Sequence, residues 1–551
     1  MHPTARTTTA FKRSQELASQ PRNARLTYYG ATSALAILST ILFVDARYLR
    51  PGPFTPSQKL GGLLLIVLAL YTTTTLRAAH IHFVKSAAAG CSPIPRFPND
   101  FAGVRYLLET ARNIKKNGLL QQRVELFEEL GRTFIHETFP DRDATVTTDE
   151  WENVKAVLAS KFEDWDLPTV RIRSFSPILG KHSIFTTNGA EWQHSRAILR
   201  PAFVRDQISD VECFDRHISK LIARIPKDGS AFDLQAMFSM MTTDSISDFM
   251  FGQSTDLQGS APEESFKFGN YFDASMHKIA VRARLGWITM LRSDPELDEY
   301  SSFMKSFVAK FVREVRMNTA TNSHRENAKK YVFLDELLKS GEPDDVIRDH
   351  LLSIFTAGRD TTTSVLSYLF HALAESPDIV STVQREIEEL GVDTPTWEHL
   401  RGMRYLNWVL KEALRLNPPV ASNQRQAVRD TILPVGGGPD GRSPVFVTKG
   451  TNIRYLPWTM HRRKDIFGED AETFRPSRWE TLRVTYEYIP FNAGPRICIG
   501  QQFALTEMAM ILFRMLQAFK TIERRDDRPP TQKLGVNLSM LYGCWVSVVP
   551  A

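Results

Sequence analysis

The stretch "PFNAGPRICIG" (Pro490–Gly500) contains two prolines, two glycines and one of the four cysteines of the chain. The run that follows, "QQFALTEMAMILFRML", places apolar residues at helical spacing, so a helix is predicted to begin just after Gly500. A thiol near a helix N-terminus favours the thiolate, and Arg496 adds positive charge, so we expect a lowered pKa for Cys498. A thiolate in a rigid loop suits a metal or a flat cofactor better than a mobile nucleophile. A buried structural cysteine is the alternative.

Composition indicates a folded protein. Of its 551 residues, 42% are hydrophobic and 24% are charged, as in ordinary globular chains. The net charge of +6 suits an anionic membrane surface and is too diffuse to indicate nucleic-acid binding. The cysteines lie far apart without CxxC or Cys/His spacing, which argues against a disulfide framework and a zinc site and favours a reducing compartment.

The N-terminal region, residues 1–90, is predicted to be a membrane anchor. Residues 26–44 and 60–76 carry no charge, and a bilayer span needs roughly 17 to 25 mostly apolar residues. Each stretch is therefore a candidate transmembrane helix, with a buried core helix as the alternative. Basic residues flank every boundary, so orientation stays open. Residues 1–25 are basic and rich in threonine, like a transit peptide, but the apolar pair that follows favours permanent anchoring.

Beyond the anchor, residues 91–103 contain three prolines and predict a stiff hinge. Residues 104–551 are predicted to form a mainly helical body with a smaller β-rich part, which includes the strand-like run "SPVFVTKGTNIRYLP". The glycine-rich "PVGGGPDGRSP" predicts a hairpin turn and not a nucleotide loop, because it does not open a helix.

A helix is predicted over residues 344–375, and "AGRDTTT" conflicts with it locally through a glycine and consecutive β-branched threonines. Such a conflict indicates either a functional site or a packing glycine beside a polar turn. On two other predicted helices, Glu412 and Arg415 are three residues apart, and Trp192 and Arg196 are four apart. Taken alone, these pairs are typical of an ordinary ion pair and of a half-buried tryptophan beside a surface arginine.

The stretch "FNAGPRICIG" matches the haem-binding signature FxxGxRxCxG of the cytochrome P450 family, the haem-thiolate monooxygenases. Four further elements resemble that family in its order: "WQHSR" (192–196), "AGRDTT" (357–362), "EALR" (412–415) and "FRPSRW" (474–479). The resemblance covers the chain from the proline-rich stretch to the C-terminus. It implies the cytochrome P450 fold, mainly α with a smaller β-rich part, and haem b as the cofactor.

The resemblance also implies roles for residues around the haem. Cys498 would be the axial thiolate ligand of the haem iron, and Phe491 would pack against the haem near that sulfur. The residues that would hold the haem propionates are Arg496, Arg196, Trp192 and, ten residues after Arg415, Arg425.

On the opposite side of the haem, Ala357 and Gly358 would let oxygen and substrate approach the iron. Asp360 and Thr361 would deliver protons to bound oxygen through ordered water. Glu412, Arg415 and Arg478 would form a buried ion-pair network that fixes the haem loop. In this chain Ser477 stands where the family usually has an acid before that last arginine.

By the same resemblance, electrons would come from NADPH through a separate flavoprotein reductase in the endoplasmic reticulum membrane, with the body facing the cytoplasm. A mitochondrial membrane, with a ferredoxin as donor, is the alternative. The haem loop and the glycine-rich hairpin resemble the fungal branch that hydroxylates n-alkanes and fatty acids at the chain end. The alternatives are a tailoring hydroxylase for a terpenoid or polyketide in fungal secondary metabolism and, more distantly, a haem protein that binds a ligand without turnover.

Overall fold

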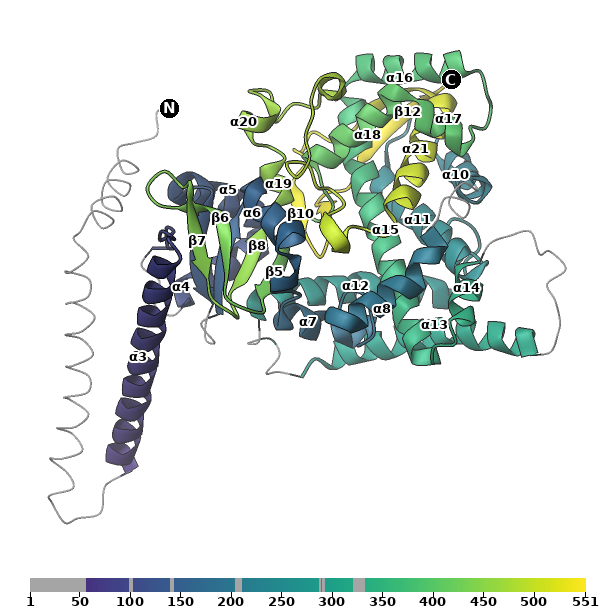
Figure 1. Ribbon diagram of the computed structural model, residues 1–551. Coiled ribbons are helices and arrows are strands. Elements are labelled where there is room, and N and C mark those ends of the chain that lie inside the picture. The colour runs from purple at the N-terminus through teal and green to yellow at the C-terminus, as the bar shows by residue number, and fades with distance from the viewer. Residues whose placement is uncertain are drawn as a thin grey trace, which may run out of the picture.

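Helices form most of the body, and strands β5, β6, β7 and β8 gather at one side of it, while β12 lies among the helices (Figure 1). The computed structural model describes residues 56–98, 103–138, 143–203, 211–286, 289, 293–320 and 332–551. The helices that follow the N-terminal one are α4 (Val104–Lys116), α5 (Leu119–Leu130), α6 (Trp151–Lys155), α7 (Thr169–Leu179), α8 (Gly189–Leu199), α10 (Glu212–Arg224), α11 (Leu234–Phe251), α12 (Glu263–Leu285), α13 (Pro295–Ala320), α14 (Phe333–Lys339), α15 (Asp344–Ala374), α16 (Pro377–Leu390), α17 (Trp397–Gly402), α18 (Arg404–Leu416), α19 (Pro457–Met460), α20 (Lys464–Phe467) and α21 (Gln501–Ala518).

The long helix α15 runs through the helical part and confirms the helix predicted over 344–375, ending one residue earlier. Its apolar residues recur at helical spacing and bury a face against α11, as the pattern predicts. Pro343 precedes its first turn and Pro377 opens the next helix, so proline punctuates both of its ends. The conflicting segment "AGRDTTT" remains helical because tertiary packing outweighs local propensity.

The β-rich part is built on a five-stranded mixed sheet of order β1-β2-β8-β5-β3. The run predicted as strands forms β7 and β8, and the glycine-rich stretch closes the β6–β7 hairpin, so both predictions are confirmed. The strands are β1 (Thr133–Thr138), β2 (Asp143–Thr148), β3 (Trp165–Asp166), β4 (Phe232–Asp233), β5 (Asn423–Ala427), β6 (Thr431–Gly437), β7 (Ser443–Val447), β8 (Asn452–Tyr455), β9 (Phe519–Arg524), β10 (Gln532–Leu534), β11 (Leu538–Met540) and β12 (Trp545–Pro550).

The N-terminal helix α3 (Pro56–Ala88) extends away from the β-rich part (Figure 1). Near its C-terminal end, Lys85 Nζ pairs with Asp430 Oδ2 at 2.6 Å. Of the two stretches predicted to span a membrane, 60–76 lies in α3 and 26–44 lies outside the described residues. Among the helices of the described residues, we find none with both the length and the apolar character to cross a bilayer.

Residues 91–98, the described beginning of the proline-rich stretch after α3, contain no helix and are hydrogen-bonded to the β-rich part. The Ser92 amide donates to Pro444 O at 2.9 Å, and Ile135 of β1 donates to Pro95 O at 2.9 Å. These bonds attach the beginning of residues 91–103 to the β6–β7 hairpin and to the five-stranded sheet.

Candidate active site

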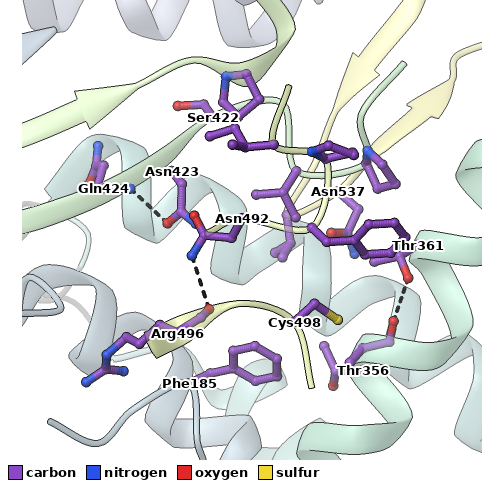
Figure 2. A pocket seen from close by; sticks show the side chains of 18 of the residues that line it. Phe185, Thr356, Thr361, Ser422, Asn423, Gln424, Asn492, Arg496, Cys498 and Asn537 are labelled. Carbon is purple, nitrogen blue, oxygen red and sulfur yellow. Dashed lines mark hydrogen bonds between the residues drawn. The ribbon is translucent and has the colours of Figure 1, made fainter. Parts of the chain in front are cut away.

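A cavity of about 410 Å³ lies between the β-rich part and the helices. The elements that line it include α4, α5, α7, α8, α11, α12, α15, α18, α21, β5, β8, the loop that carries Cys498, and the turn between β10 and β11. Figure 2 shows the Cys498 sulfur facing this space, with Thr361 and Thr356 of α15 across from it. Every residue predicted to contact the haem lines the cavity: Cys498, Phe491, Arg496, Arg196, Trp192, Arg425 and Gly358.

The Cys498 loop is held in one shape by backbone contacts. The Cys498 amide donates to Phe491 O at 2.9 Å, and α21 begins at Gln501, as predicted. Gly494 has φ +67°, and a Cβ there would lie 1.7 Å from the carbonyl oxygen of Leu158, so only glycine fits. Asn492 is also left-handed at φ 63°, a conformation that asparagine tolerates. Its side chain accepts from Tyr455 Oη at 2.9 Å and donates to Arg496 O at 3.2 Å.

The lowered pKa expected for Cys498 is wrong for the protein alone. The Cys498 side chain is exposed, and it faces the cavity. Desolvation by the surrounding protein nevertheless raises its pKa, although the Gly500 amide and Arg196 act in the opposite direction. A helix N-terminus and one arginine do not offset the loss of solvation. A thiolate at this position therefore requires a further cation, which a bound haem iron would supply.

Four arginines of the cavity form a group that we call the first arginine cluster: Arg171, Arg196, Arg425 and Arg496. Burial lowers the pKa of Arg496 to about 9, and the other three guanidinium groups add repulsion. Burial and Arg425 lower the pKa of Arg171 to about 10. In the described part of the chain, no carboxylate lies within ion-pair distance of any of the four. Such a cluster requires an anion.

The donors of this cluster fit the two propionates of a haem. The Nε atoms of Arg171 and Arg496 are buried and have no hydrogen-bond partner. Arg196 Nη1 donates to Ile497 O at 3.0 Å, which ties α8 to the cysteine loop. The Arg496 guanidinium lies over the Trp192 ring, 4.3 Å from its centroid. The sequence did not point to Arg171 as a residue of the site, because an arginine on an amphipathic helix is typical of a protein surface.

The two residues of α15 predicted to deliver protons, Thr361 and Asp360, differ in their position relative to the cavity. Thr361 lines the cavity, and its Oγ1 donates to Ala357 O at 2.6 Å. Asp360 is not among the lining residues, and Arg359 Nη1 donates to its Oδ1 at 3.2 Å. Burial raises the pKa of Asp360 to about 6. Gly358 lines the cavity and also allows close packing, since a Cβ would lie 2.6 Å from Ile246 Cδ1 of α11.

The predicted ion-pair network is present as a buried cluster beside the loop. Arg415 binds Glu412 through Nε at 2.9 Å and Nη2 at 2.8 Å, and both side chains are 0% exposed. Arg478 Nε donates to Glu412 Oε1 at 2.8 Å. Where the family usually has an acid at position 477, Asp470 pairs with Arg478 at 3.2 Å, so an acid from elsewhere in the chain supplies that contact.

His461, which sequence reasoning missed, joins this network to the loop. Arg415 Nη1 donates to His461 O at 2.8 Å, and the Ile489 amide donates to His461 Nε2 at 2.9 Å. The imidazole is therefore neutral, with Nδ1 donating to Arg415 O at 3.2 Å. Burial and Arg415 lower its pKa to about 3. No local signal in "MHRRKD" marks this histidine, because its partners lie far away in sequence.

Comparison with known proteins agrees with this geometry. The family model "Cytochrome P450" matches residues 95–541. The "Cytochrome P450 monooxygenase fsdH" of Fusarium heterosporum is 39% identical over 94% of this chain and 89% of its own. The "Cytochrome P450 monooxygenase himC" of Aspergillus japonicus is 38% identical over 82% of this chain and 83% of its own. "Cytochrome P450 52A12" of Debaryomyces hansenii is 35% identical over 88% of this chain and 96% of its own.

The cofactor that this family uses is haem b, reduced by electrons from a reductase, and the cavity has the donor set to hold it. A cysteine faces the space where an iron ligand is needed, and unpaired arginines lie where propionates need cations. The chain belongs to the cytochrome P450 family, and it is a haem-dependent monooxygenase.

Proposed function

We propose that this cytochrome P450 inserts one oxygen atom of O₂ into a C–H bond at the chain end of a fatty acid or an n-alkane. The observation that carries the proposal is the apolar lining of the cavity beyond Cys498. This lining includes Leu119, Leu120, Ala280, Ala283, Val365, Leu534 and Val536. Such a surface suits an alkyl chain because burying it removes apolar area from water. The likeness of the loop and hairpin sequences to the fungal alkane and fatty-acid hydroxylases supports the same substrate class.

In this proposal each residue of the site has one task. Haem, when bound, supplies the activation of dioxygen. Cys498 Sγ provides the thiolate ligand that donates electron density to it. The first arginine cluster and Trp192 hold the propionates and so orient the haem, with Phe491 packed beside the sulfur. Ala357 and Gly358 keep room for the substrate above it.

Proton delivery is assigned to Thr361 and Asp360. The Thr361 hydroxyl donates to Ala357 O and keeps a lone pair to accept from water in the cavity. Asp360, with a pKa of about 6, can bind and release a proton near neutral pH. Because its carboxylate faces Arg359 and not the cavity, water beside Thr361 would complete the path.

The test is an optical titration of the ferric protein with lauric acid, palmitic acid and dodecane, followed by turnover with a reductase and NADPH. A saturable low-spin to high-spin shift, with product hydroxylated at the chain end, is expected. If neither the acids nor the alkane change the spin state, the proposed substrate class is wrong.

A second candidate function is hydroxylation of a terpenoid or polyketide in a fungal secondary-metabolite pathway. Relatives with names outside the 52A series are 38% and 39% identical to this chain, against 35% for 52A12. The same apolar lining would accept these compounds. A terpenoid and polyketide panel belongs in the same titration, and a spin shift with one of these compounds alone would favour this function.

We further propose that residues 1–90 attach the enzyme to the endoplasmic reticulum membrane with its body in the cytoplasm. Support comes from the apolar stretches 26–44 and 60–76 and from the basic residues around them. In this setting the electron donor would be an NADPH-dependent flavoprotein reductase. Turnover with that reductase is expected to exceed turnover with a ferredoxin and its reductase. The reverse result, with the full chain in mitochondrial fractions, would favour the mitochondrial alternative.

A further inference from the structure

Seven arginines line the cavity, while the described residues that line it include no aspartate or glutamate. Four of them form the first arginine cluster, which is sufficient for two propionates. The other three, Arg123 of α5, Arg284 of α12 and Arg454 of β8, form a second arginine cluster. In the described part of the chain, none of these three lies within 4.0 Å of a carboxylate oxygen.

The second cluster is separate from the first. In the β5–β8 pairing, Gln424 lies opposite Arg454 and Arg425 lies opposite Ile453. Successive side chains of a strand point to opposite faces, so Arg425 and Arg454 belong to different faces of the sheet. The charges agree with this division. Arg454 and Arg123 help to lower the pKa of Arg284, whereas Arg425 helps to lower the pKa of Arg171.

The second cluster is built around Tyr106 of α4. Arg454 Nη1 donates to Tyr106 Oη at 2.9 Å, and the Arg123 guanidinium lies 5.2 Å from the centre of its ring. With the Gln424 amide turned so that its oxygen faces Arg454, Nε and Nη2 donate to that oxygen at 2.8 and 2.6 Å. Arg454 is thus held in place by protein groups and contributes its charge.

Donors remain for a ligand. Arg123 is 7% exposed, and its Nη1 is buried with no hydrogen-bond partner. Burial and the neighbouring arginines lower the pKa of Arg284 to about 10. Arg284 Nη2 donates to Gly535 O at 2.5 Å, which brings it to the turn that carries Val536 and Asn537. Three cations and an unpaired donor beside an apolar cavity form a site for an anion attached to an apolar chain.

We propose that the second arginine cluster binds the carboxylate of the substrate, so that the enzyme acts on fatty acids in preference to n-alkanes. This rests on the proposed function and narrows it. With the carboxylate bound at this cluster, the far end of the chain would extend toward Gly358 and Thr361 of α15, which line the same cavity. Terminal hydroxylation follows from that placement, and the oxidised position is set by the distance from the carboxyl end.

The experiment uses probes that bind iron whatever the substrate is. The ω-imidazolyl derivatives of octanoic, dodecanoic and hexadecanoic acid are titrated optically into the full-length ferric enzyme beside the corresponding 1-alkylimidazoles. The imidazole ligates the iron, and the carboxylate reports on the cluster. At the matching chain length, the acid is expected to bind about tenfold or more tightly than its neutral counterpart.

Arg123→Gln, Arg284→Gln and the double variant are expected to remove this preference and to leave the affinity for the neutral probes unchanged. Arg105→Gln is the matched control, because Arg105 is exposed on α4 and pairs with Glu109 at 2.8 Å. If Arg123→Gln fails to incorporate haem, the result with Arg284→Gln still tests whether the second arginine cluster binds the carboxylate. Equal binding of acid and neutral probes at every length, or a preference that survives in the variants, would overturn the proposal.

Failure of the proposed function gives a different result. If the acid probes keep their arginine-dependent advantage but lauric and palmitic acid are not hydroxylated, the cluster binds the carboxylate of another lipophilic acid. If both acids and dodecane are hydroxylated with no effect of the arginine variants, the proposed function holds and this assignment is wrong.

Discussion

Thr361 of α15 lines the cavity, and the carboxyl of Asp360 beside it is turned to Arg359. Its Oγ1 donates to Ala357 O, a bond that orients the hydroxyl oxygen as an acceptor for water. The proposed role depends on that oxygen and not on the methyl group. The two parts of the side chain can therefore be tested separately.

Thr361→Ala is expected to lower the product formed per NADPH by roughly tenfold and to divert electrons to hydrogen peroxide, because proton delivery is lost. Thr361→Ser keeps the hydroxyl and is expected to restore most of the coupling. NADPH consumption, peroxide and product are measured together in the reconstituted system. Unchanged coupling in Thr361→Ala would exclude the role.

Glu507 is a second buried carboxyl close to this helix. Ser245 Oγ and Thr362 Oγ1 donate to its two oxygens at 2.7 and 3.2 Å. The side chain is 2% exposed, and burial raises its pKa from 4.5 to about 7. The unfolded chain therefore releases this proton at a lower pH than the folded chain does. The contribution of the protonated Glu507 carboxyl to the free energy of unfolding is greatest below pH 4.5. It is lost as the pH rises to about 7.

Glu507→Gln should remove this pH dependence. Relative to wild type, the variant is expected to gain on the order of 3 kcal/mol of unfolding free energy between pH 4.5 and pH 8. Urea unfolding across this range, followed by circular dichroism, measures the difference. Parallel pH profiles for the two proteins would show that Glu507 ionises normally.

At the scale of elements, the cysteine loop depends on its contact with the π-helical turn η1 (Ala156–Ser160). Gly494 touches the carbonyl of Leu158 in that turn, and the contact leaves no room for a side chain. The loop places Cys498 at the cavity only while this approach is kept. The β6–β7 hairpin offers a comparison, since Gly441 has a similar φ of +69° with open space around it.

Gly494→Ala is expected to destabilise the holoenzyme by more than about 3 kcal/mol, because strain at positive φ adds to a clash with backbone. The ratio of bound haem to protein should fall with it. Gly441→Ala is the control and should cost about 1 kcal/mol with normal haem content. Thermal midpoints and haem absorbance compare the two. A similar loss in both variants would mean that the approach to Leu158 is unimportant.

At the scale of the whole molecule, the Glu412 network joins parts of the chain that are distant in sequence. Glu412 of α18 accepts from Arg415, Arg478 and Trp479, the last through Nε1 at 3.0 Å. His461 then carries the connection to the residue before the cysteine loop. Because these side chains are buried, removing one charge leaves its partners unpaired.

Glu412→Gln is therefore expected to cost about 3 to 5 kcal/mol and to reduce haem incorporation, since Arg415 loses its counter-charge and Arg478 keeps Asp470 alone. Glu388→Gln on the exposed face of α16 is the control and should stay within about 0.5 kcal/mol of wild type. The measurement is the free energy of unfolding of both variants. Wild-type stability in Glu412→Gln would contradict a structural role for the charge.

The sequence by itself determined the local features of this protein. Helical periodicity predicted α15 and α21, the glycine-rich stretch predicted the β6–β7 hairpin, and the loop signature pointed to Cys498 as the ligand. These features depend on residues close together in the chain, so their spacing suffices to find them. The signature also indicated the cytochrome P450 family, which the family model and the relatives confirm.

Only the tertiary structure decided the electrostatics of the site. It reversed the expected pKa shift of Cys498, because desolvation depends on everything packed around a group. It turned Asp360 toward Arg359 and supplied Asp470 in place of the acid missing at position 477. It also brought arginines from α5, α12 and β8 to the cavity that Tyr106 lines. Each of these residues is ordinary in its own segment, and its role arises from neighbours that folding brings from distant parts of the chain.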